Sequence, residues 1–505
     1  MAALLLGCSS LAPRANLPTA HVRADATDSP LGLLVAQAAS SAAEGHSAFR
    51  LLPDAAFALD ARLELARRAT RTLDVQYYLF RCDALGTQIL REMRSAGARG
   101  VTVRMILDDL HIERDDELFS AFAALPNVEV RLFNPLAARS GAPLSRVLRS
   151  LPDLFRINHR MHNKLFIADN SLSISGGRNI GQEYFMQDDK ANFIDVDILA
   201  AGPVVREQSR AFDLYWNSAQ VVPVQALVAQ PSDFAARHFD ELAAVPELPI
   251  PAQTEDPLGR GPVSRELADG RLNLIWAPAQ VYVDNPAKVA RATTQERFAG
   301  SVTERTLAVI SAAQSSVFIV SPYFIPGDVG LSIMRDASQR GVTTTVLTNS
   351  LGATDEAVVH FAYARYRPRM LALGVRLYEM SPVLSRRLTK LGNFGRSQGR
   401  LHAKVAFIDG RRIFVGSMNL DGRSASLNTE IGLLIESQAL VSDFRRLMDG
   451  DRFRGAYELR LDAQGELLWV AHASDGTETA TPYEPGAGVL PLQRLLAPLL
   501  PEELL

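Results

Sequence analysis

One short stretch of sequence occurs twice in this chain. Residues 162–169 read His-Asn-Lys-Leu-Phe-Ile-Ala-Asp, and residues 402–409 read His-Ala-Lys-Val-Ala-Phe-Ile-Asp. Both copies keep His, Lys and Asp at the same spacing, although the 505 residues contain only nine His and five Lys. A repeated pattern of rare residue types indicates two copies of one structural unit.

The repeat extends beyond this stretch in both directions. An Asn follows each His after 17 residues, and an acidic residue lies further downstream in both copies. The matched segments are Arg99-Gly100-Val101 with Arg340-Gly341-Val342, Val130–Phe133 with Val375–Tyr378, Asn179 with Asn419, and Asp195 with Glu430. Their offsets stay within a few residues of 240, which indicates a tandem duplication.

Each copy alternates strand and helix signals. Strands are expected at 73–80, 101–107 and 128–133, and again at 317–324, 342–347 and 375–378, with helices at 87–98 and 331–339. Strand–helix–strand order with short connections favours parallel pairing and α/β layers. After each His-x-Lys, two apolar runs separated by Asn170 or by Gly410-Arg411 predict a hairpin. The fold class is therefore α/β, as two tandem domains.

The repeat also predicts the domain organisation. We expect the first α/β domain at 46–225 and the second at 273–465. Residues 226–272, rich in Pro, Ala and Glu, are expected to form a linker or insertion. Residues 466–505 are expected to form a C-terminal tail, and residues 1–45 an N-terminal segment and tether.

The repeated residue types suit phosphoryl chemistry. His and Lys two positions apart on a strand project from the same face. A neutral imidazole is a competent nucleophile, and a second, protonated imidazole can donate to a leaving oxygen. Lys and Asn donate to the non-bridging oxygens of a phosphate, on which charge grows during reaction. Nucleophile and acid approach phosphorus from opposite sides, so we expect the two copies to share one active site.

A carboxylate next to each imidazole would complete this set. Asp195 and Glu430 are placed to accept from the Nδ1 atoms, which would hold the tautomer and favour the imidazolium. The candidate catalytic residues are His162, Lys164, Asn179 and Asp195 in the first copy, and His402, Lys404, Asn419 and Glu430 in the second.

The paired His-x-Lys-x4-Asp motifs, each followed by a small-residue turn and an Asn, resemble those of the phospholipase D superfamily. Within it, the chain is most similar to bacterial cardiolipin synthases of the C type. The supporting segments are Asp74–Tyr78, Gly202–Val205, Phe212–Ser218, Ser321–Phe324, Asn349-Ser350, Thr354-Asp355 and His360. The resemblance implies mixed sheets flanked by helices, pseudo-two-fold symmetry, a phosphohistidine intermediate, and neither a metal nor another cofactor.

The same resemblance implies roles for individual residues. His162 would be the nucleophile and His402 the acid, while Asp169 and Asp409 would be structural. The expected substrate contacts are Gly177, Ser417, Tyr78, Tyr323 and His360. Gly177 departs from the pattern, because many relatives have Ser there, and this removes one hydroxyl donor from the first half of the site.

Composition and charge narrow the choice of partners. A net charge of −3 argues against a protein that mainly coats nucleic acid. No run of apolar residues is long enough for a membrane-spanning helix, and Cys8 and Cys82 are too few for a disulfide framework. Residues 138–160 and 381–400 are rich in basic residues, and we expect them to contact anionic headgroups at a membrane surface. Solvated loops are the alternative.

The first residues resemble a bacterial lipobox, in which the Cys becomes lipidated. Met1 to Gly7 supply an apolar stretch before Cys8, although it is short and carries no positive charge. We expect a lipid anchor at Cys8 and a peripheral, periplasm-facing position in a bacterial cell envelope. A chance match is the alternative.

The expected function is a phosphatidyltransferase. It would make cardiolipin from phosphatidylglycerol and a second phospholipid, either phosphatidylglycerol or phosphatidylethanolamine, through a phosphohistidine. Hydrolysis of phospholipids to phosphatidic acid is the nearest alternative. A nuclease of the same superfamily and an inactive lipid-binding protein are further alternatives, and no nucleic-acid partner is expected.

Overall fold

The computed structural model describes residues 17, 19–21, 28–39, 44–112, 115–136, 154–228, 235–246, 254–387, 394–448, 454–473 and 475–486. Cys8, residues 138–153 and 388–393 of the two basic stretches, and residues 487–505 of the expected tail lie outside the described residues. Among the described helices, none combines the length and the apolar character needed to cross a membrane.

A mixed sheet dominates the first half of the chain. Its strand order is β10-β1-β8-β6-β5-β2-β3-β4-β9. The strands are β1 (Ser47–Leu52), β2 (Thr72–Tyr77), β3 (Thr102–Asp108), β4 (Val128–Phe133), β5 (Leu165–Ala168), β6 (Leu172–Gly176), β8 (Asp197–Ala201), β9 (Val221–Pro223) and β10 (Ile275–Ala277). β2, β3 and β4 are parallel, and the other neighbours are antiparallel.

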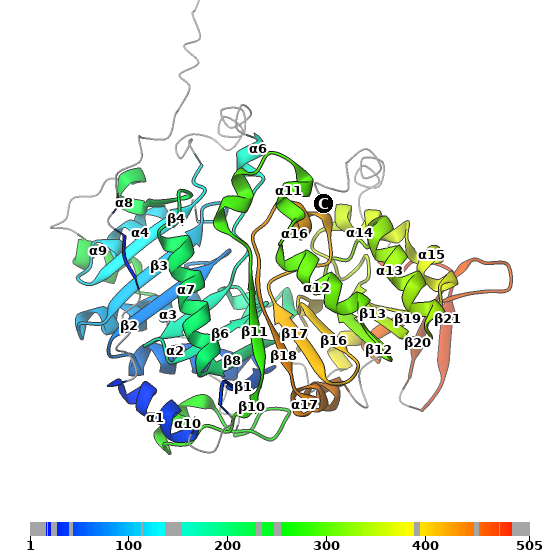
Figure 1. Cartoon of the computed structure of the whole chain (residues 1–505), viewed down its shortest axis with the longest axis horizontal. Helices are drawn as coiled ribbons and strands as arrows, with labels where there is room; N and C mark the ends of the chain where they lie inside the picture. Colours follow the sequence, from blue (N-terminus) through cyan, green and yellow to red (C-terminus); the bar gives the residue numbers. More distant parts are fainter. Residues whose placement is uncertain are drawn as a thin grey trace, which may run out of the picture.

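A second mixed sheet lies beside the first (Figure 1). Its order is β11-β18-β17-β16-β12-β13-β14-β19-β20-β21. The strands are β11 (Ala279–Val283), β12 (Ser316–Val320), β13 (Thr343–Asn349), β14 (Arg376–Met380), β16 (Val405–Ile408), β17 (Arg412–Gly416), β18 (Ile431–Glu436), β19 (Ala456–Leu461), β20 (Leu467–His472) and β21 (Glu478–Thr481). β7 (Ala191–Ile194) and β15 (Gln398–Leu401) form a separate parallel pair that joins the two halves.

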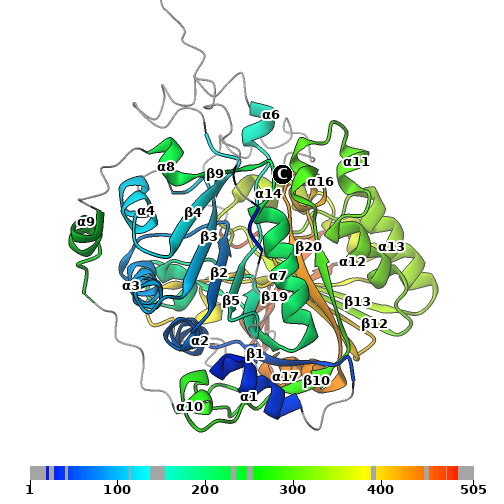
Figure 2. The ribbon, with the colours of Figure 1, turned by 60° about the vertical axis from the view of Figure 1, so that its left-hand side comes forward.

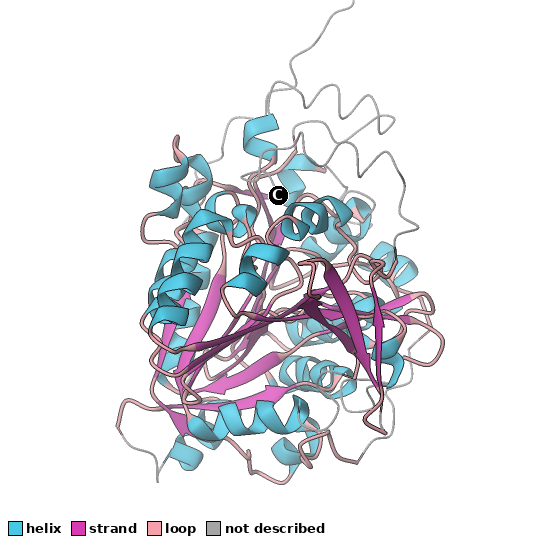
Figure 3. Ribbon diagram, turned by 90° about the vertical axis from the view of Figure 1, so that its right-hand side faces the viewer, coloured by secondary structure: helices cyan, strands magenta, loops and turns pink. Residues whose placement is uncertain are grey.

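Helices flank both sheets (Figure 3). Those of the first half are α1 (Pro30–Ala38), α2 (Ala55–Arg68), α3 (Ala84–Ala98), α4 (Asp116–Ala123), α6 (Leu154–Ile157), η4 (Gln182–Phe185), α7 (Pro203–Trp216), α8 (Val224–Leu227), α9 (Ala235–Leu242) and α10 (Val263–Ala268). Those of the second half are η6 (Pro286–Ala290), α11 (Thr294–Phe298), α12 (Val302–Ser311), α13 (Gly327–Gln339), α14 (Ala357–Ala364), α15 (Arg367–Ala372), η7 (Leu384–Arg387), α16 (Gly422–Ser426) and α17 (Gln438–Met448).

The two sheets share one topology, which confirms the predicted duplicated α/β fold. The order β8-β6-β5-β2-β3-β4 in the first sheet corresponds to β18-β17-β16-β12-β13-β14 in the second. In both, the three strands at one end are parallel and the preceding ones antiparallel. The expected helices fall within α3 and α13, and the expected hairpins are β5–β6 and β16–β17.

Sheet membership crosses the expected domain boundaries at both ends of the second domain. β10, at 275–277, pairs with β1 of the first sheet rather than with its own half. β20 and β21, from the expected tail, add two antiparallel strands to the second sheet, and the Trp469 indole donates to Glu379 over 3.0 Å. The expected linker contains helices α9 and α10, and Glu266 of α10 pairs with buried Arg50 at 2.8 Å.

The interface between the halves is a continuous core. α7 lies on the side of the first sheet that faces β11 (Figure 2). Its Phe212 and Trp216 belong to the same buried apolar cluster as Leu433 of β18 and Val441 of α17. The Tyr215 hydroxyl donates to the carbonyl of Asp284 over 2.8 Å across this boundary. A shared core of this kind holds the two halves as one unit.

The Asp that ends each repeated motif closes a backbone turn. Asp169 accepts hydrogen bonds from the N–H groups of Thr70, Arg71 and Thr72, at 2.7 to 3.1 Å. Asp409 accepts from the N–H groups of residues 314–316 in the same way. Asp169 is fully buried, whereas Asp409 is partly exposed. Each carboxylate ties the chain that enters β2 or β12 to its hairpin.

We predict that Asp169→Ala lowers the free energy of unfolding by about 1–3 kcal/mol, because the N–H groups of residues 70–72, of which Thr72 is buried, lose their acceptor. A lower midpoint of thermal unfolding by circular dichroism would show this. The matched variant Asp409→Ala should lower the midpoint less, because water reaches that turn. Equal midpoints for the wild type and Asp169→Ala would contradict the structural assignment.

Candidate active site

Both repeated histidines line a single cleft between the halves. It encloses about 750 Å³, and its wall includes His162 and Asn179 from the first half and His402 and Asn419 from the second. Both imidazoles are largely buried, with 8% and 5% of the side-chain surfaces exposed. The two copies of the motif therefore contribute to one site, as the sequence predicted.

Backbone pairing between the halves holds each histidine in place. The N–H of His162 donates to the carbonyl of Thr429 over 2.9 Å, and Thr429 N–H donates back to Arg160 over 2.9 Å. On the other side, β15 pairs with β7, and His402 N–H donates to the carbonyl of Ile194 over 2.8 Å. The segment that leads into each histidine thus lies beside the segment that carries the acidic residue of the opposite half.

A side chain at the end of a parallel strand fixes the residue before each histidine. Asp108, at the end of β3, accepts from Met161 N–H over 2.8 Å. Asn349, at the end of β13, both accepts from Leu401 N–H and donates to its carbonyl, each over 2.9 Å. The backbone groups of Met161 and Leu401 that do not pair with a neighbouring strand are thus bound by a side chain. These contacts hold the segment before each histidine in place.

The histidine–carboxylate pairs cross between the halves. His162 Nδ1 lies 3.0 Å from Glu430 Oε2, and His402 Nδ1 lies 2.6 Å from Asp195 Oδ2. With Nδ1 donated to a carboxylate, Nε2 is the ring nitrogen that remains for chemistry in the cleft. Each half therefore needs the carboxylate of the other to orient its histidine.

The two carboxylates are supported differently. The hydroxyls of Ser417 and Ser424 donate to Glu430, and Ser424 Oγ also accepts from the N–H of Asn419 over 3.1 Å. At the position equivalent to Ser417, a Cβ on Gly177 would lie 2.2 Å from Asp195 Oδ1. The shorter Asp195 side chain thus occupies the space of a Ser side chain, and Gly177 is required there.

Burial determines the charge state of the site. It lowers the pKa of His162 to about 4 despite the nearby Glu430, and burial together with Lys404 lowers the pKa of His402 to about 4. Burial would raise the pKa of Glu430, but His162 and Lys164 outweigh it and bring the pKa to about 2. Near neutral pH, neutral imidazoles therefore donate Nδ1–H to ionised carboxylates.

The two lysines lie directly behind their histidines. Lys164 Nζ donates to the carbonyl of His162 over 2.7 Å, and Lys404 Nζ donates to that of His402 over 2.5 Å. Burial lowers both pKa values, that of Lys404 to about 8. Each ammonium has three N–H donors and uses one here, which leaves donors for an anion.

Two predicted substrate contacts lie at the cleft. Tyr78 and Tyr323 line it, and the Tyr78 ring packs edge-on against His162 with centroids 5.0 Å apart. The Tyr78 hydroxyl is 3.0 Å from His111 Nε2, and the Tyr323 hydroxyl donates to Asp355 over 2.7 Å.

Three other predicted contacts, His360, Ser417 and Gly177, are not among the residues that line the cleft. His360 is 4% exposed and its Nε2 lies 2.8 Å from Glu484 and 2.7 Å from Arg367, so a salt-bridge network rather than substrate surrounds it. The Ser417 hydroxyl donates to Glu430. Gly177 contacts Asp195. The substrate contacts predicted for these three residues stay predictions. In the structure, His360 braces α14 against residue 484, and Ser417 and Gly177 shape the carboxylates.

Sequence reasoning missed several residues that shape the cleft. Tyr184 and Phe193 pack against the His402 ring with centroids 5.1 and 5.0 Å away. Arg400 and Arg423 add positive charge to the cleft wall. Tyr184, Phe193 and Arg423 have no counterpart at equivalent positions of the other copy, so the repeat did not identify them. Arg400 matches Arg160, since each stands two residues before its His, and this repeated Arg is the signal that could have found it. Among the described residues, no group of three or more His, Cys, Asp or Glu side chains is arranged as a metal site.

Two His-x-Lys half-sites in one cleft, carried by a duplicated mixed α/β domain, define an enzyme of the phospholipase D superfamily. The family described as "Cardiolipin synthase, PLD-like domain" matches residues 63–216 and 306–452. The chain belongs to this family, which confirms the family predicted from the motifs.

Individual relatives agree with this assignment. The chain is 37% identical over 415 residues to cardiolipin synthase C of Escherichia coli (strain K12), covering 82% of this chain and 86% of the relative. It is 25% identical over 405 residues to cardiolipin synthase A of Pseudomonas fluorescens, covering 80% and 68%. In fold it is similar to phosphatidylserine synthase of Haemophilus influenzae, with a TM-score of 0.57 and 13% identity, over 93% of this chain and 99% of that one.

We predict that Glu430→Gln lowers kcat/KM for a water-soluble chromogenic phosphodiester by about 10²- to 10⁴-fold, because His162 loses its ionic acceptor. Ser417→Gly, which gives the second half the residue of the first, should cost less because Glu430 keeps Ser424. Equal losses in the two variants would contradict the importance of the charge on Glu430.

Proposed function

We propose that this enzyme transfers a phosphatidyl group from one phospholipid to the alcohol of another and so makes cardiolipin. The observation that carries the proposal is the crossed arrangement of His162 with Glu430 and His402 with Asp195 around one cleft. It supplies two imidazoles from opposite halves, as in-line displacement at phosphorus requires. The cardiolipin synthase relatives support phospholipids as the substrate class.

In the first half-reaction His162 acts as the nucleophile. Its Nε2 attacks the phosphorus of phosphatidylglycerol, and the bond from phosphorus to the glycerol headgroup oxygen breaks. His402 gives its Nε2 proton to the departing glycerol, and a phosphatidyl group remains on His162. Because the anionic phosphate raises the pKa of a nearby imidazole, His402 gains this proton when the lipid binds.

In the second half-reaction a lipid alcohol replaces the glycerol. His402, now neutral, takes the hydroxyl proton of the second phospholipid, whose oxygen attacks phosphorus. The bond from phosphorus to His162 breaks, which restores the neutral imidazole. Phosphatidylglycerol supplies this hydroxyl. Phosphatidylethanolamine, which has no headgroup hydroxyl, is the alternative donor in the first half-reaction, where ethanolamine leaves in place of glycerol.

The remaining motif residues stabilise the charge that develops on phosphate. Lys164 and Lys404 carry N–H donors beyond those bound to the histidine carbonyls, and Asn179 and Asn419 line the cleft. Donors fixed before the reaction stabilise the transition state without reorganisation. Asp195 and Glu430 stabilise whichever imidazole is protonated at each stage.

Water is the competing acceptor, and it would turn the enzyme into a phospholipid hydrolase. Transfer is favoured when the acceptor lipid fills the cleft and keeps water out. A peripheral position at a membrane would supply that lipid at high local concentration. We propose that the basic stretches at 138–160 and 381–400 contact anionic headgroups, and that lipidated Cys8 anchors the protein on the periplasmic side. Labelled palmitate that fails to mark the protein would contradict the anchor.

A lipid assay tests the reaction. Purified protein and phosphatidylglycerol vesicles, with and without phosphatidylethanolamine, should yield cardiolipin in EDTA, identified by mass spectrometry. His162→Ala and His402→Ala should each lower the rate of product formation by about 10³-fold or more, because each half-reaction needs both imidazoles. Phosphatidic acid as the only product would assign hydrolysis instead, and no turnover of phospholipid would contradict the proposal.

Trapping the intermediate tests the assignment of roles. With a donor whose leaving group needs no protonation, such as a phosphatidyl nitrophenol, His402→Asn should still release one equivalent of nitrophenol and retain the phosphatidyl group. Peptide mapping should then find it on His162. Its presence on His402 of the reciprocal variant, His162→Asn, would reverse the roles.

The pH profile tests the contribution of Lys404. Its pKa is lowered to about 8, chiefly by burial, so its positive charge is present below that pH and is lost as the pH rises through it. We predict that kcat/KM declines above about pH 8 in the wild type. In Lys404→Arg, which stays charged, this decline should move to higher pH even if the overall rate is lower. An unchanged profile would show that another group titrates.

A further inference from the structure

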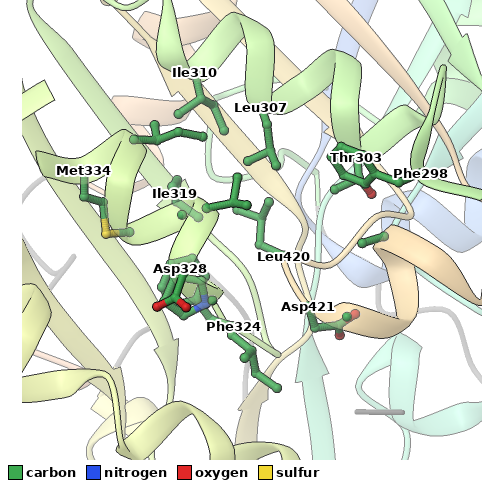
Figure 4. A pocket seen from close by; sticks show the side chains of 18 of the residues that line it. Phe298, Thr303, Leu307, Ile310, Ile319, Phe324, Asp328, Met334, Leu420 and Asp421 are labelled. Atoms are coloured by element: carbon green, nitrogen blue, oxygen red, sulfur yellow. The ribbon is translucent and has the colours of Figure 1, made fainter. Parts of the chain in front are cut away.

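A second cavity lies next to the catalytic cleft, within the second domain. It encloses about 520 Å³ between the second sheet and helices α11, α12, α13 and α16. Figure 4 shows Leu307 and Ile310 on one side of it and Phe324, Leu420 and Asp421 on the opposite side. The wall is predominantly apolar, and the volume is typical of a small-molecule site.

One thin wall separates the cavity from the cleft. Tyr323 lines the cleft and Phe324 lines the cavity, just as Asn419 lines the cleft and Leu420 lines the cavity. Phe324 and Leu420 are paired as a parallel β-bridge, and Ile325 N–H donates to the carbonyl of Leu420 over 2.7 Å. Because successive side chains of extended backbone point to opposite sides, this pair presents polar groups to one space and apolar groups to the other.

The two spaces meet at Asp421, which lines both. Its carboxylate caps α16 by accepting from Ser424 N–H over 2.8 Å. Burial, with Glu430 nearby, raises its pKa to about 7. The group is therefore neutral for much of the time near pH 7, which lowers the cost of placing an apolar chain beside it.

At its other end the cavity reaches the protein surface. Val329 is 63% exposed, and the side chain of Asp328 is 90% exposed and pairs with Arg369 at 3.3 Å. Both Asp328 and Val329 belong to the cavity wall. An occupant longer than the cavity can therefore continue outwards past α13.

At the equivalent wall of the first domain, the described side chains pack against one another. There the paired residues are Phe80 and Ile180, which are 1% and 0% exposed. Phe80 packs edge-on against Phe119 of α4, with centroids 5.9 Å apart, inside the core of that domain. The duplicated fold thus permits this region to be filled, so the cavity in the second domain is a property of its own side chains.

We infer that the cavity binds one fatty acyl chain of the phospholipid whose phosphate lies in the cleft. This inference rests on the proposed function and names the part of the lipid that the second domain recognises. In a glycerophospholipid the phosphate and the acyl chains share one glycerol, so a chain site has to lie within a few bonds of the phosphate site. The step from Asn419 to Leu420 provides that short distance.

The inference predicts a dependence on chain length. Each methylene that enters an apolar site strengthens binding by up to about fourfold. Phosphatidylglycerol with two octanoyl chains should therefore have a kcat/KM about tenfold higher than the dihexanoyl lipid, because one bound chain gains two methylenes. Both lipids are used as monomers, below the concentration at which they aggregate, so that a membrane surface does not contribute.

Variants that fill the cavity test its location. Leu307→Trp and Ile333→Trp enlarge side chains on α12 and α13, on walls away from Asn419 and Asp421. Both should bring the octanoyl-to-hexanoyl ratio of kcat/KM close to one. Leu33→Trp, at a site 61% exposed on α1, adds an indole elsewhere and should keep the wild-type ratio. A second measurement uses calorimetric titration of His162→Ala with dioctanoyl phosphatidylglycerol, where Leu307→Trp should weaken binding about tenfold.

The outcomes separate this inference from the proposed function. A wild-type ratio near one, or an elevated ratio that both filling variants retain, overturns the acyl-chain site while the transferase remains. Absence of turnover with both lipids in the wild type overturns the proposed function, and the inference with it. A ratio that falls in both filling variants but persists in Leu33→Trp supports the inference.

Discussion

Pairing of backbone across the two halves is the constraint on which the site depends. The segment before each histidine lies beside the segment that carries the opposite carboxylate, through β15 with β7 and through Met161 with Thr429. This pairing sets the positions of the imidazoles, while Asp108 and Asn349 fix the residue before each one. The shared core around Phe212 and Leu433 stabilises the interface that makes the pairing possible.

The sequence was sufficient for the duplicated α/β fold and for the cleft that its two halves share. Two copies of a motif with a fixed spacing of His, Lys and Asn predict a duplicated domain and a shared cleft. The crossing of the pairs was not predictable, because Asp195 and Glu430 occupy equivalent positions and spacing alone does not distinguish the two possible pairings. The contacts of His360 were not predictable for a related reason, because its partner Glu484 lies 124 residues away, beyond the end of β21. The contact of Ser424 with Glu430 was not predictable from a repeated pattern, because it depends on the turn that brings the two residues together.

Burial and charge act in opposite directions at the centre of the cleft. Removal from water favours neutral imidazoles and lowers the pKa values of His162 and His402, whereas the carboxylates favour protonated ones. The resting site is therefore ready for nucleophilic attack, and the negative charge of an arriving phosphodiester shifts one imidazole towards an acid. The charge of the substrate thus produces the protonated imidazole that the reaction needs.

The crossed pairs are what an isologous contact between two identical subunits would produce, in which each copy gives its carboxylate to its neighbour. Joining the copies in one chain removes the requirement that both change together. The first half has Gly177 with Asp195, where the second has Ser417 with Glu430. The second half also contains the apolar cavity, whereas the side chains at the equivalent wall of the first half pack against one another. A covalently fused pair can thus distinguish the two ends of a substrate, which a symmetric dimer with interchangeable sides cannot do.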